Sequence, residues 1–148
     1  MRWQKLAALF ALALAVTARA EPTGIIKVLP HFLDLKGRAS LSPSLFDRDA
    51  YQQQLRSTPT NRSGIRFDVQ WKAPGQDALT LRLDLKGAKG REPRTMSVEK
   101  AVHGGRYSQW TSIPLGGTNY ETFGELVSWR ARLLDGTNVV SEQRSFLW

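Results

Sequence analysis

The stretch GIRFDVQWKAPGQDALTLRLDLKG, residues 64–87, decides the fold. Apolar side chains recur at every second position on both sides of its Pro-Gly pair. They are Ile65, Phe67, Val69 and Trp71 before the pair, and Leu79, Leu81, Leu83 and Leu85 after it. A period of two places such side chains on one face of a β-strand and the intervening polar residues on the other. We therefore expect two strands, joined by the turn at residues 74–77 into an antiparallel hairpin with one face in water.

Strand patterns continue towards the C-terminal side of this stretch. A weaker alternation covers residues 94–102, Gly104-Gly105 marks a turn, and residues 107–113 are expected to form a further strand. In residues 125–136 the alternation predicts one inward and one outward set of side chains. The inward set is Val127, Trp129, Ala131 and Leu133, and the outward set is Ser128, Arg130 and Arg132. Asp135-Gly136 is a hairpin signal that returns the chain as residues 138–148. Six or so strands with Gly and Pro between them are typical of a β-sandwich or barrel.

The segment before residue 64 has a different pattern. Residues 24–35 are expected to supply one or two strand segments, broken or bent at Pro30. A short helix is predicted near residues 44–56, because Ser44 and Asp47 have the spacing of a capping box. Apolar pairs at a spacing of four residues support it, and they are Phe46 with Ala50 and Tyr51 with Leu55. We expect this helix to lie over an end or edge of the sheets.

Residues 1–20 have the pattern of a secretory signal peptide. Arg2 and Lys5 precede an apolar run of eleven residues, and Ala18-Arg19-Ala20 follows as a cleavage site. The run is too short to span a bilayer as a stable helix. We therefore expect residues 21–148 to form one exported domain, periplasmic or extracellular and not membrane-spanning after cleavage. Within it, residues 21–63 would hold one or two strands and the helix, and residues 64–148 the main strands.

The composition limits the classes of partner that the chain is expected to bind. The formal net charge of +8 becomes about +5 without residues 1–20, since 18 basic and 13 acidic residues remain. Lys and Arg are scattered among Asp and Glu, whereas a nucleic-acid-binding surface requires a basic stripe. The charge supports no more than mild attraction to anionic envelope polymers. With no cysteine, the exported chain has no disulfide, thiol chemistry or zinc–thiolate site, and its fold must rest on burial.

The segment LGGTNY, residues 115–120, followed by the strand that ends in WRARLLDG, carries a resemblance. It resembles the late strands of a fibronectin type III or related immunoglobulin-like sandwich over residues 64–148. In that family a tyrosine before the penultimate strand bonds through its hydroxyl to nearby backbone, a role that would fall to Tyr120. Phe123-Gly124 and the helical segment depart from the family pattern. The resemblance implies an immunoglobulin-like antiparallel β-sandwich. As a whole the chain resembles short exported bacterial proteins, a likeness that implies no activity.

The aromatic residues near Trp148 have two explanations. A small outer-membrane β-barrel ends on such a residue, but Glu142 and Arg144 would then face lipid, at roughly 2–4 kcal/mol for Arg144 near the midplane. Alternatively, the last strand pairs with residues 125–134, and Phe146 and Trp148 plug the open end of a sandwich. We expect the second arrangement, with Trp148 as part of the core or a cap on it.

The sequence predicts no catalytic, metal or cofactor residues. Its two histidines, His31 and His103, are not in a metal-ligand spacing, and no serine-nucleophile motif is present. The candidate ligand surface is Trp110 with Tyr107 or Tyr120, since Ser residues two positions before and after Trp110 make its strand face mixed. An exposed Trp110 could stack on a sugar ring or on a side chain of a partner. The alternative is that it packs into the sandwich, as most large aromatic side chains do.

We therefore expect a non-enzymatic exported domain. Its first expected role is protein interaction, or an accessory or structural role, in the cell envelope or outside the cell. The alternative is a carbohydrate-binding module for an envelope or extracellular glycan, and the second alternative is the small outer-membrane barrel. The side to which Trp110 points separates the first two.

Overall fold

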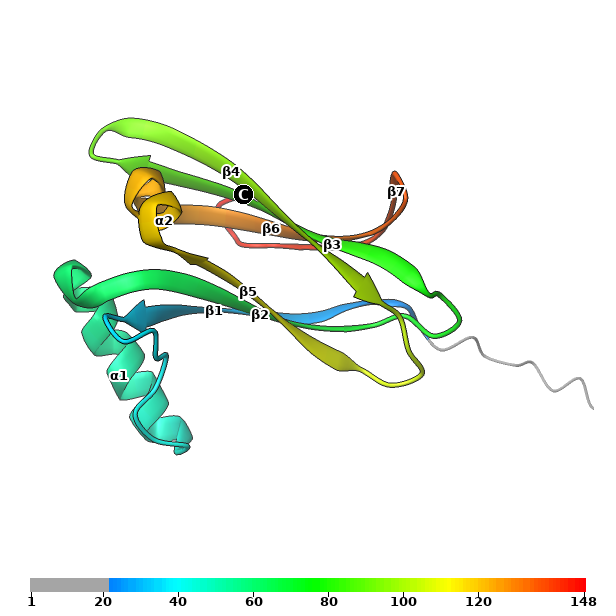
Figure 1. Ribbon diagram of the computed structural model, residues 1–148, viewed down its shortest axis with the longest axis horizontal. Coiled ribbons are helices and arrows are strands. Elements are labelled where there is room, and N and C mark those ends of the chain that lie inside the picture. Colours follow the sequence, from blue (N-terminus) through cyan, green and yellow to red (C-terminus); the bar gives the residue numbers. More distant parts are fainter. Residues whose placement is uncertain (1–21) are drawn as a thin grey trace, which may run out of the picture.

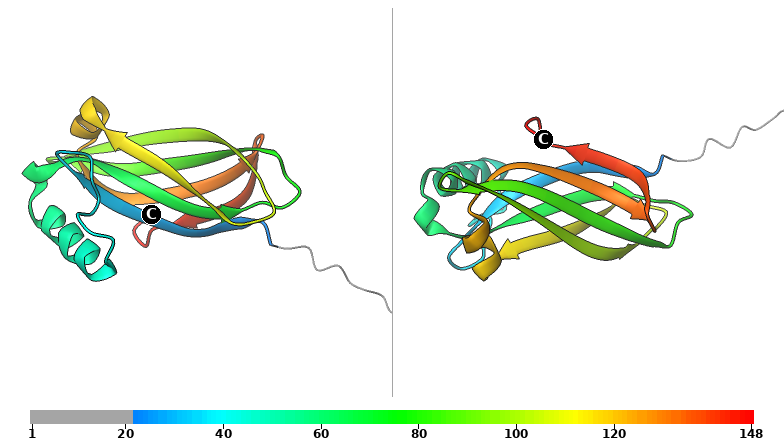
Figure 2. Two further views of the ribbon diagram at one scale, coloured as in Figure 1. Left: turned by 60° about the horizontal axis from the view of Figure 1, so that its bottom comes forward. Right: turned by 90° about the horizontal axis from the view of Figure 1, so that it is seen from above.

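The structure is a computed structural model that describes residues 22–148, so the predicted signal peptide lies outside the described residues. Two antiparallel sheets pack face to face (Figures 1 and 2). Sheet A has the order β1 (Gly24–Asp34), β2 (Arg62–Lys72), β5 (Gln109–Gly116). Sheet B has the order β4 (Glu92–His103), β3 (Ala78–Lys89), β6 (Glu125–Asp135), β7 (Asn138–Arg144). The prediction of a mainly β, antiparallel sandwich is confirmed.

Within residues 22–148, two α-helices accompany the sheets. The first, α1 (Leu45–Ser57), begins one residue after its N-cap Ser44 and confirms the helix predicted near residues 44–56; a 3₁₀ turn, η1 (Pro59–Asn61), follows it. The second, α2 (Gly117–Phe123), was not predicted, because seven residues are too few to show a helical period. Phe46 of α1 is 81% exposed, so the predicted apolar pair of Phe46 with Ala50 does not face the protein.

The core lies between the sheets and consists largely of the alternating residues of β2 and β3. The eight apolar side chains predicted to point inward from residues 64–87 are all at most 4% exposed. Trp71, which is fully buried, donates its indole N–H to Thr111 Oγ1 at 2.9 Å. Because a buried donor without a partner would be costly, this bond lets the largest core side chain be buried completely.

The hairpin predicted between these two strands is wrong. In the structure β2 pairs with β1 and β5, whereas β3 pairs with β4 and β6. Residues 73–77 therefore cross from sheet A to sheet B. Ala73 is fully buried in this crossing, and Gly104 N donates to Asp77 O at 2.8 Å. A Cβ atom on Gly104 would lie 2.6 Å from Ala73 O. The segment 73–77 therefore packs directly against the connection between β4 and β5.

The predicted inward set of β6 is wrong at its start. The pairing shifts between Lys86 and Gly87, which lie opposite Ser128 and Leu126, so that Val127 bulges out of the ladder. Val127 is 51% exposed and Ser128 only 2%, the reverse of the prediction. Beyond the bulge the prediction holds. Ala131 and Leu133 are buried, Trp129 packs against the core, and Arg130 and Arg132 lie on the outer face of sheet B.

The predicted aromatic plug at residues 146–148 is also wrong. After β7 the chain folds back across sheet B, where Ser145 N donates to Trp129 O at 2.9 Å. Phe146 is fully exposed and Leu147 is 68% exposed. The Trp148 ring centroid lies 4.0 Å from Lys86 Nζ and 4.7 Å from Arg130 Cζ. Attraction between these cations and the ring holds Trp148 on the outer face rather than in the core.

The sandwich is instead plugged at one end by α2. This helix contacts strands of both sheets. Its Phe123 is 2% exposed, and a Cβ atom added to Gly87 would lie only 2.6 Å from the Phe123 ring. Tyr120 of the same helix packs partly buried against the core. The aromatic plug therefore exists, but it comes from the connection between β5 and β6.

One side of the sandwich is closed by contacts between its two edge strands, β1 and β7. Ser141 Oγ accepts from Ile25 N at 3.0 Å. The amide of Gln143 donates to the carbonyl oxygens of Ile25 and Ile26, each at 3.1 Å. Side chains of sheet B thereby satisfy backbone groups that the edge of sheet A would otherwise expose.

Candidate functional site

The helix α1 lies across one end of the outer face of sheet A (Figures 1 and 2). The least exposed residues of α1 are Arg48, Tyr51, Gln52 and Leu55, which share one helical face. Gln52 pairs with β1 as a strand residue would: its Oε1 accepts from Phe32 N at 2.8 Å, and its Nε2 donates to Phe32 O at 2.9 Å. The second hydrogen of the amide goes to Ala39 O at 2.7 Å. These bonds hold α1 against the sheet.

Asp34, at the end of β1, provides a second attachment. Its side chain is only 8% exposed, and its carboxylate accepts from Tyr51 Oη at 2.6 Å and from Arg38 Nε at 2.9 Å. The backbone N–H groups of Lys36 and Arg38 donate to it as well. Burial alone would raise the pKa of Asp34, but these hydrogen bonds, led by that of Tyr51, hold it well below its ordinary value.

A pocket of about 310 Å³ opens between α1 and the outer face of sheet A. It is lined by Leu29, His31, Arg48, Asp68 and Trp110, and we call it the Trp110 pocket. Trp110 is 52% exposed, so it does not pack into the sandwich. Four elements contribute to the lining, and they are β1, α1, β2 and β5.

Asp68 organises the polar side chains of this pocket. Its Oδ1 accepts from Ser112 Oγ at 2.5 Å, and its Oδ2 accepts from Arg66 Nη2 at 2.9 Å and His31 Nδ1 at 3.1 Å. Partial burial alone would raise the pKa of Asp68, but the bonds from Ser112, Arg66 and His31 lower it below its ordinary value. Because a carboxylate only accepts, the His31 proton is assigned to Nδ1, and Nε2 of the neutral ring is an acceptor.

Three groups in the lining remain available to a ligand. Arg48 is half-buried, yet its side chain makes no hydrogen bond or ion pair with any residue between 22 and 148. The Nε2 atom of His31 and the indole N–H of Trp110 also have no partner among those residues. The pocket therefore combines an accessible aromatic ring with hydrogen-bond donors and an acceptor.

The other two residues of the predicted ligand surface lie elsewhere. Tyr107, 73% exposed, is in the loop before β5, with the Arg106 guanidinium 5.7 Å from its ring centroid. Tyr120 follows the opposite end of β5, whose eight residues span roughly 26 Å. The structure therefore does not bring Trp110 and Tyr120 together.

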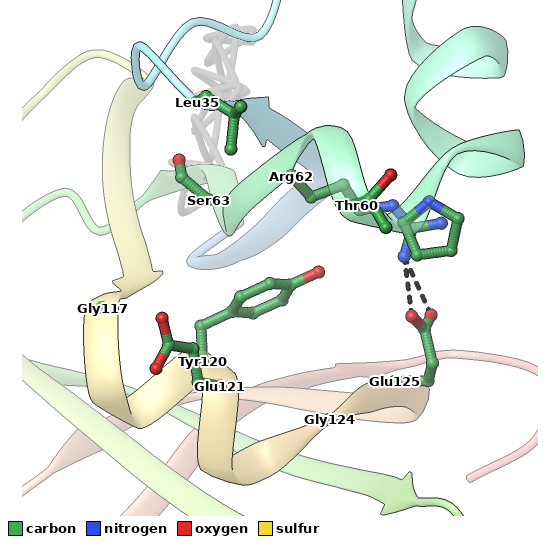
Figure 3. Close-up of a pocket in the computed structure, with 10 residues that line it drawn as sticks. Leu35, Thr60, Arg62, Ser63, Gly117, Tyr120, Glu121, Gly124 and Glu125 are labelled. Carbon is green, nitrogen blue, oxygen red and sulfur yellow. Dashed lines mark hydrogen bonds and ion pairs between the residues drawn. The ribbon is translucent and has the colours of Figure 1, made fainter.

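Tyr120 lines a second pocket of about 430 Å³, the Tyr120 pocket, at the end of the sandwich beside α2. Figure 3 shows its ring pointing across the pocket towards Thr60 and Arg62. The hydroxyl makes no hydrogen bond with residues 22–148, so the backbone bond implied by the family resemblance is not found there. The remaining lining residues are Leu35, Pro59, Ser63, Gly117, Glu121, Gly124 and Glu125.

Arg62, the arginine that lines the Tyr120 pocket, has a structural role. Arg62 donates from Nε to Leu55 O at 2.6 Å and from Nη2 to Arg56 O at 2.5 Å. These carbonyl oxygens belong to the last turn of α1, where a helix lacks internal donors. Nη1 of Arg62 contacts both carboxylate oxygens of Glu125 at 2.9 Å (Figure 3). All three guanidinium nitrogens are engaged, so Arg62 caps α1 and has no nitrogen without a partner.

Residues 22–148 contain neither a metal-binding cluster nor a membrane-spanning helix. In that range no group of three or more His, Asp and Glu side chains is placed to hold a metal ion. His103 is exposed, with Nδ1 at 3.4 Å from Asp77 Oδ1. No helix in the described part of the chain has the length and apolar character to cross a bilayer.

The Trp110 pocket is therefore the candidate site, because its arginine, Arg48, is available to a ligand, whereas the arginine of the Tyr120 pocket, Arg62, is engaged. Of its residues, the sequence pointed only to Trp110, through the mixed face of that strand. Arg48, His31 and Asp68 come together only through the pairing of β1 with β2 and the position of α1. The chain matches no protein-family model, no curated protein and no solved structure.

Proposed function

We propose that the chain is a non-enzymatic, exported binding domain that holds a saccharide in the Trp110 pocket. The observation that carries this proposal is the half-exposed indole of Trp110 beside unpaired polar groups. The partly positive C–H groups of a sugar ring pack well on the negative face of an aromatic ring. His31 Nε2 can accept from a sugar hydroxyl, and the N–H groups of Arg48 and Trp110 can donate to one. Export is supported by the signal-peptide pattern of residues 1–20.

The strand arrangement supports a fibronectin type III or immunoglobulin-like relationship. Lettered A to G in chain order, strands β1, β2 and β5 take the places of A, B and E, and β3, β6 and β7 those of C, F and G. The fourth strand lies beside β3, unlike strand D of a constant-type immunoglobulin domain. Sandwiches of this kind serve many functions, so the site rather than the fold carries the functional argument.

The test is binding of residues 21–148 to an oligosaccharide array, followed by titration of each sugar that binds. Wild type is expected to bind at least one sugar, and Trp110→Ala to bind it about 30-fold more weakly, as for an aromatic hot spot of about 2 kcal/mol. Tyr107→Ala is the matched control, because it removes an exposed aromatic side chain outside the pocket. Circular dichroism of the variants checks their fold. Absence of sugar binding, or equal binding by wild type and Trp110→Ala, would refute the proposal.

A protein partner is the second candidate, favoured by apolar side chains around the start of α1. Leu41, Leu45 and Phe46 are 61%, 72% and 81% exposed, and neighbouring apolar side chains of this size are typical of interaction surfaces. Capture of an envelope protein by wild type and Trp110→Ala alike, with loss in Phe46→Ser, would support this candidate. Capture that depends on Trp110 and disappears after glycosidase treatment of the extract would support the saccharide instead.

A further inference from the structure

The cation Arg48 has no counter-charge in the Trp110 pocket. The pocket is lined by one carboxylate, Asp68, and that carboxylate pairs with Arg66 through Nε at 3.1 Å and Nη2 at 2.9 Å. No oxygen of Asp68 comes within ion-pair distance of Arg48. Asp68, Arg66 and Arg48 together carry a net charge of +1, and the unpaired positive charge is that of Arg48.

Asp68 has little capacity left to bind Arg48 through a rearrangement. Its two oxygens already accept four hydrogen bonds, from Ser112, His31 and two nitrogens of Arg66. A carboxylate oxygen offers about two lone-pair sites, so Oδ2, which accepts three of these bonds, is saturated, while Oδ1 accepts only the bond from Ser112. A new bond from Arg48 to Oδ2 would have to displace one of these donors.

The position of Arg48 makes its lack of a partner significant. It lies on the face of α1 that packs against sheet A, with Tyr51 and Gln52 one turn further along, and it is half-buried. The protein therefore covers part of the Arg48 side chain, while its guanidinium donors stay available to a ligand of the pocket.

A second cation, Lys27, lies on the outer face of sheet A, in the same cross-strand row as Trp110. The register places Lys27 opposite Gln70 and Gln70 opposite Trp110, so Lys27 is two strands away, at roughly 10 Å. Lys27 is exposed and has no ion pair within residues 22–148. The surface beside the pocket therefore favours an anion as well.

We propose that the ligand of the Trp110 pocket is an acidic sugar, whose anionic oxygens bind Arg48 while its ring stacks on Trp110. This inference rests on the proposed saccharide-binding function. A planar guanidinium binds a carboxylate or a phosphate through two parallel N–H···O bonds, which a neutral hydroxyl cannot reproduce. The shared chemistry is a sugar that carries an oxyanion, either the carboxylate of a uronic acid or a phosphate ester.

The experiment compares sugars with and without an anionic group. Residues 21–148 are titrated with oligogalacturonate and its methyl ester, and with glucose 6-phosphate and glucose, at fixed ionic strength and with Trp fluorescence as the readout. In at least one pair the acidic sugar is expected to bind about 10-fold or more tightly, as for hydrogen bonds to a charged group. The pair that shows the preference identifies the oxyanion.

Two matched variants distinguish a direct contact of the ligand with Arg48 from a general effect of positive charge on the protein. Arg48→Met should remove the preference for the acidic sugar and leave the neutral sugar bound through Trp110. Arg56→Met is the control, since it removes the same charge from an exposed position of the same helix, outside the pocket. It should keep the preference.

Three results would overturn the inference while leaving saccharide binding intact. These are equal binding of acidic and neutral sugars, an unchanged preference in Arg48→Met, and an equal loss in Arg48→Met and Arg56→Met. Failure of every sugar on the array to bind would instead refute the proposed function, and the inference with it.

Discussion

Asp34 is a single residue on which the attachment of α1 depends. It receives two backbone and two side-chain hydrogen bonds at the point where β1 turns towards the helix. Tyr51, one of the donors, lies next to Gln52, which bonds directly to β1. Since Arg48 lies one turn earlier on the same face, the position of the candidate site depends on this carboxylate.

At the scale of this residue, Asp34→Asn should lower the free energy of unfolding by about 1–3 kcal/mol at pH 7, the range for lost bonds to a charged group. The folded pKa of Asp34 lies below its unfolded value of about 4, so its contribution is complete above pH 4 and is lost as the pH falls below it. The difference between wild type and variant should therefore shrink at pH 3. Urea unfolding at pH 7 and pH 3 measures both effects.

The control for this measurement is Asp49→Asn. Asp49 is an exposed carboxylate of α1 without a side-chain partner among residues 22–148. Its replacement should change the unfolding free energy by less than about 0.5 kcal/mol, as is usual at the surface. A difference between wild type and Asp34→Asn that grew at acid pH would contradict the assigned direction of the pKa shift.

At the scale of elements, the two helices are held in different ways. The shorter helix, α2, is anchored by burial of Phe123 between the sheets. The longer helix, α1, contributes one fully buried apolar side chain, Leu55, and is otherwise attached by polar contacts. Helices with so little apolar burial depend on capping and specific hydrogen bonds, so the α1 attachment should be the more sensitive to single polar substitutions.

Arg62→Leu should therefore destabilise the protein more than Glu125→Gln, although the two residues form one ion pair. The first change leaves the carbonyl oxygens of Leu55 and Arg56 without their donor, and we expect a loss of about 1–3 kcal/mol. Glu125 is 59% exposed, so its loss should cost less than about 1 kcal/mol. Equilibrium unfolding of both variants tests the order, and equal losses would show that the ion pair, rather than the helix cap, is what matters.

Strand positions were predictable from the sequence because the period of two is local. The strands around Phe67 and Leu83 appear where that period occurs, with the expected faces. Pairing was not predictable, since β2 and β3 point the same residues inward whether they form a hairpin or cross between sheets. The bulge at Val127 depends on β3, which approaches from another part of the chain. Such features are set by partners that alternation does not identify.

The candidate site was predictable only in its aromatic member. Ser108 and Ser112 on either side of Trp110 indicated a strand face that is not wholly apolar. Arg48 reads as one of several charges on a helix, and Asp68 as an outward strand residue beside Arg66. These two side chains come close together only because of the β1–β2 register and the position of α1, both of which belong to the tertiary structure.

At the scale of the whole molecule, the core is complete without residues 146–148. Deleting them should remove the contacts of Trp148 with Lys86 and Arg130, each of about 0.5–1 kcal/mol at an exposed site. The variant should therefore stay folded, with a melting temperature only a few degrees lower. Phe123→Ala, which empties the plug at the end of the sandwich, should cost about 3–5 kcal/mol. Thermal unfolding that ranked the two changes the other way would refute this placement of the core.

The contact between β1 and β7 has a mechanical consequence. Ile25 meets Ser141 while Ile25 and Ile26 meet Gln143, so the two strands run in the same direction side by side. Tension applied between residues 22 and 148 would pull these strands along their length in opposite directions. Their hydrogen bonds would then bear the load together in shear, instead of opening one after another from an end. The domain is thus suited to resist unfolding when force is applied between these two points.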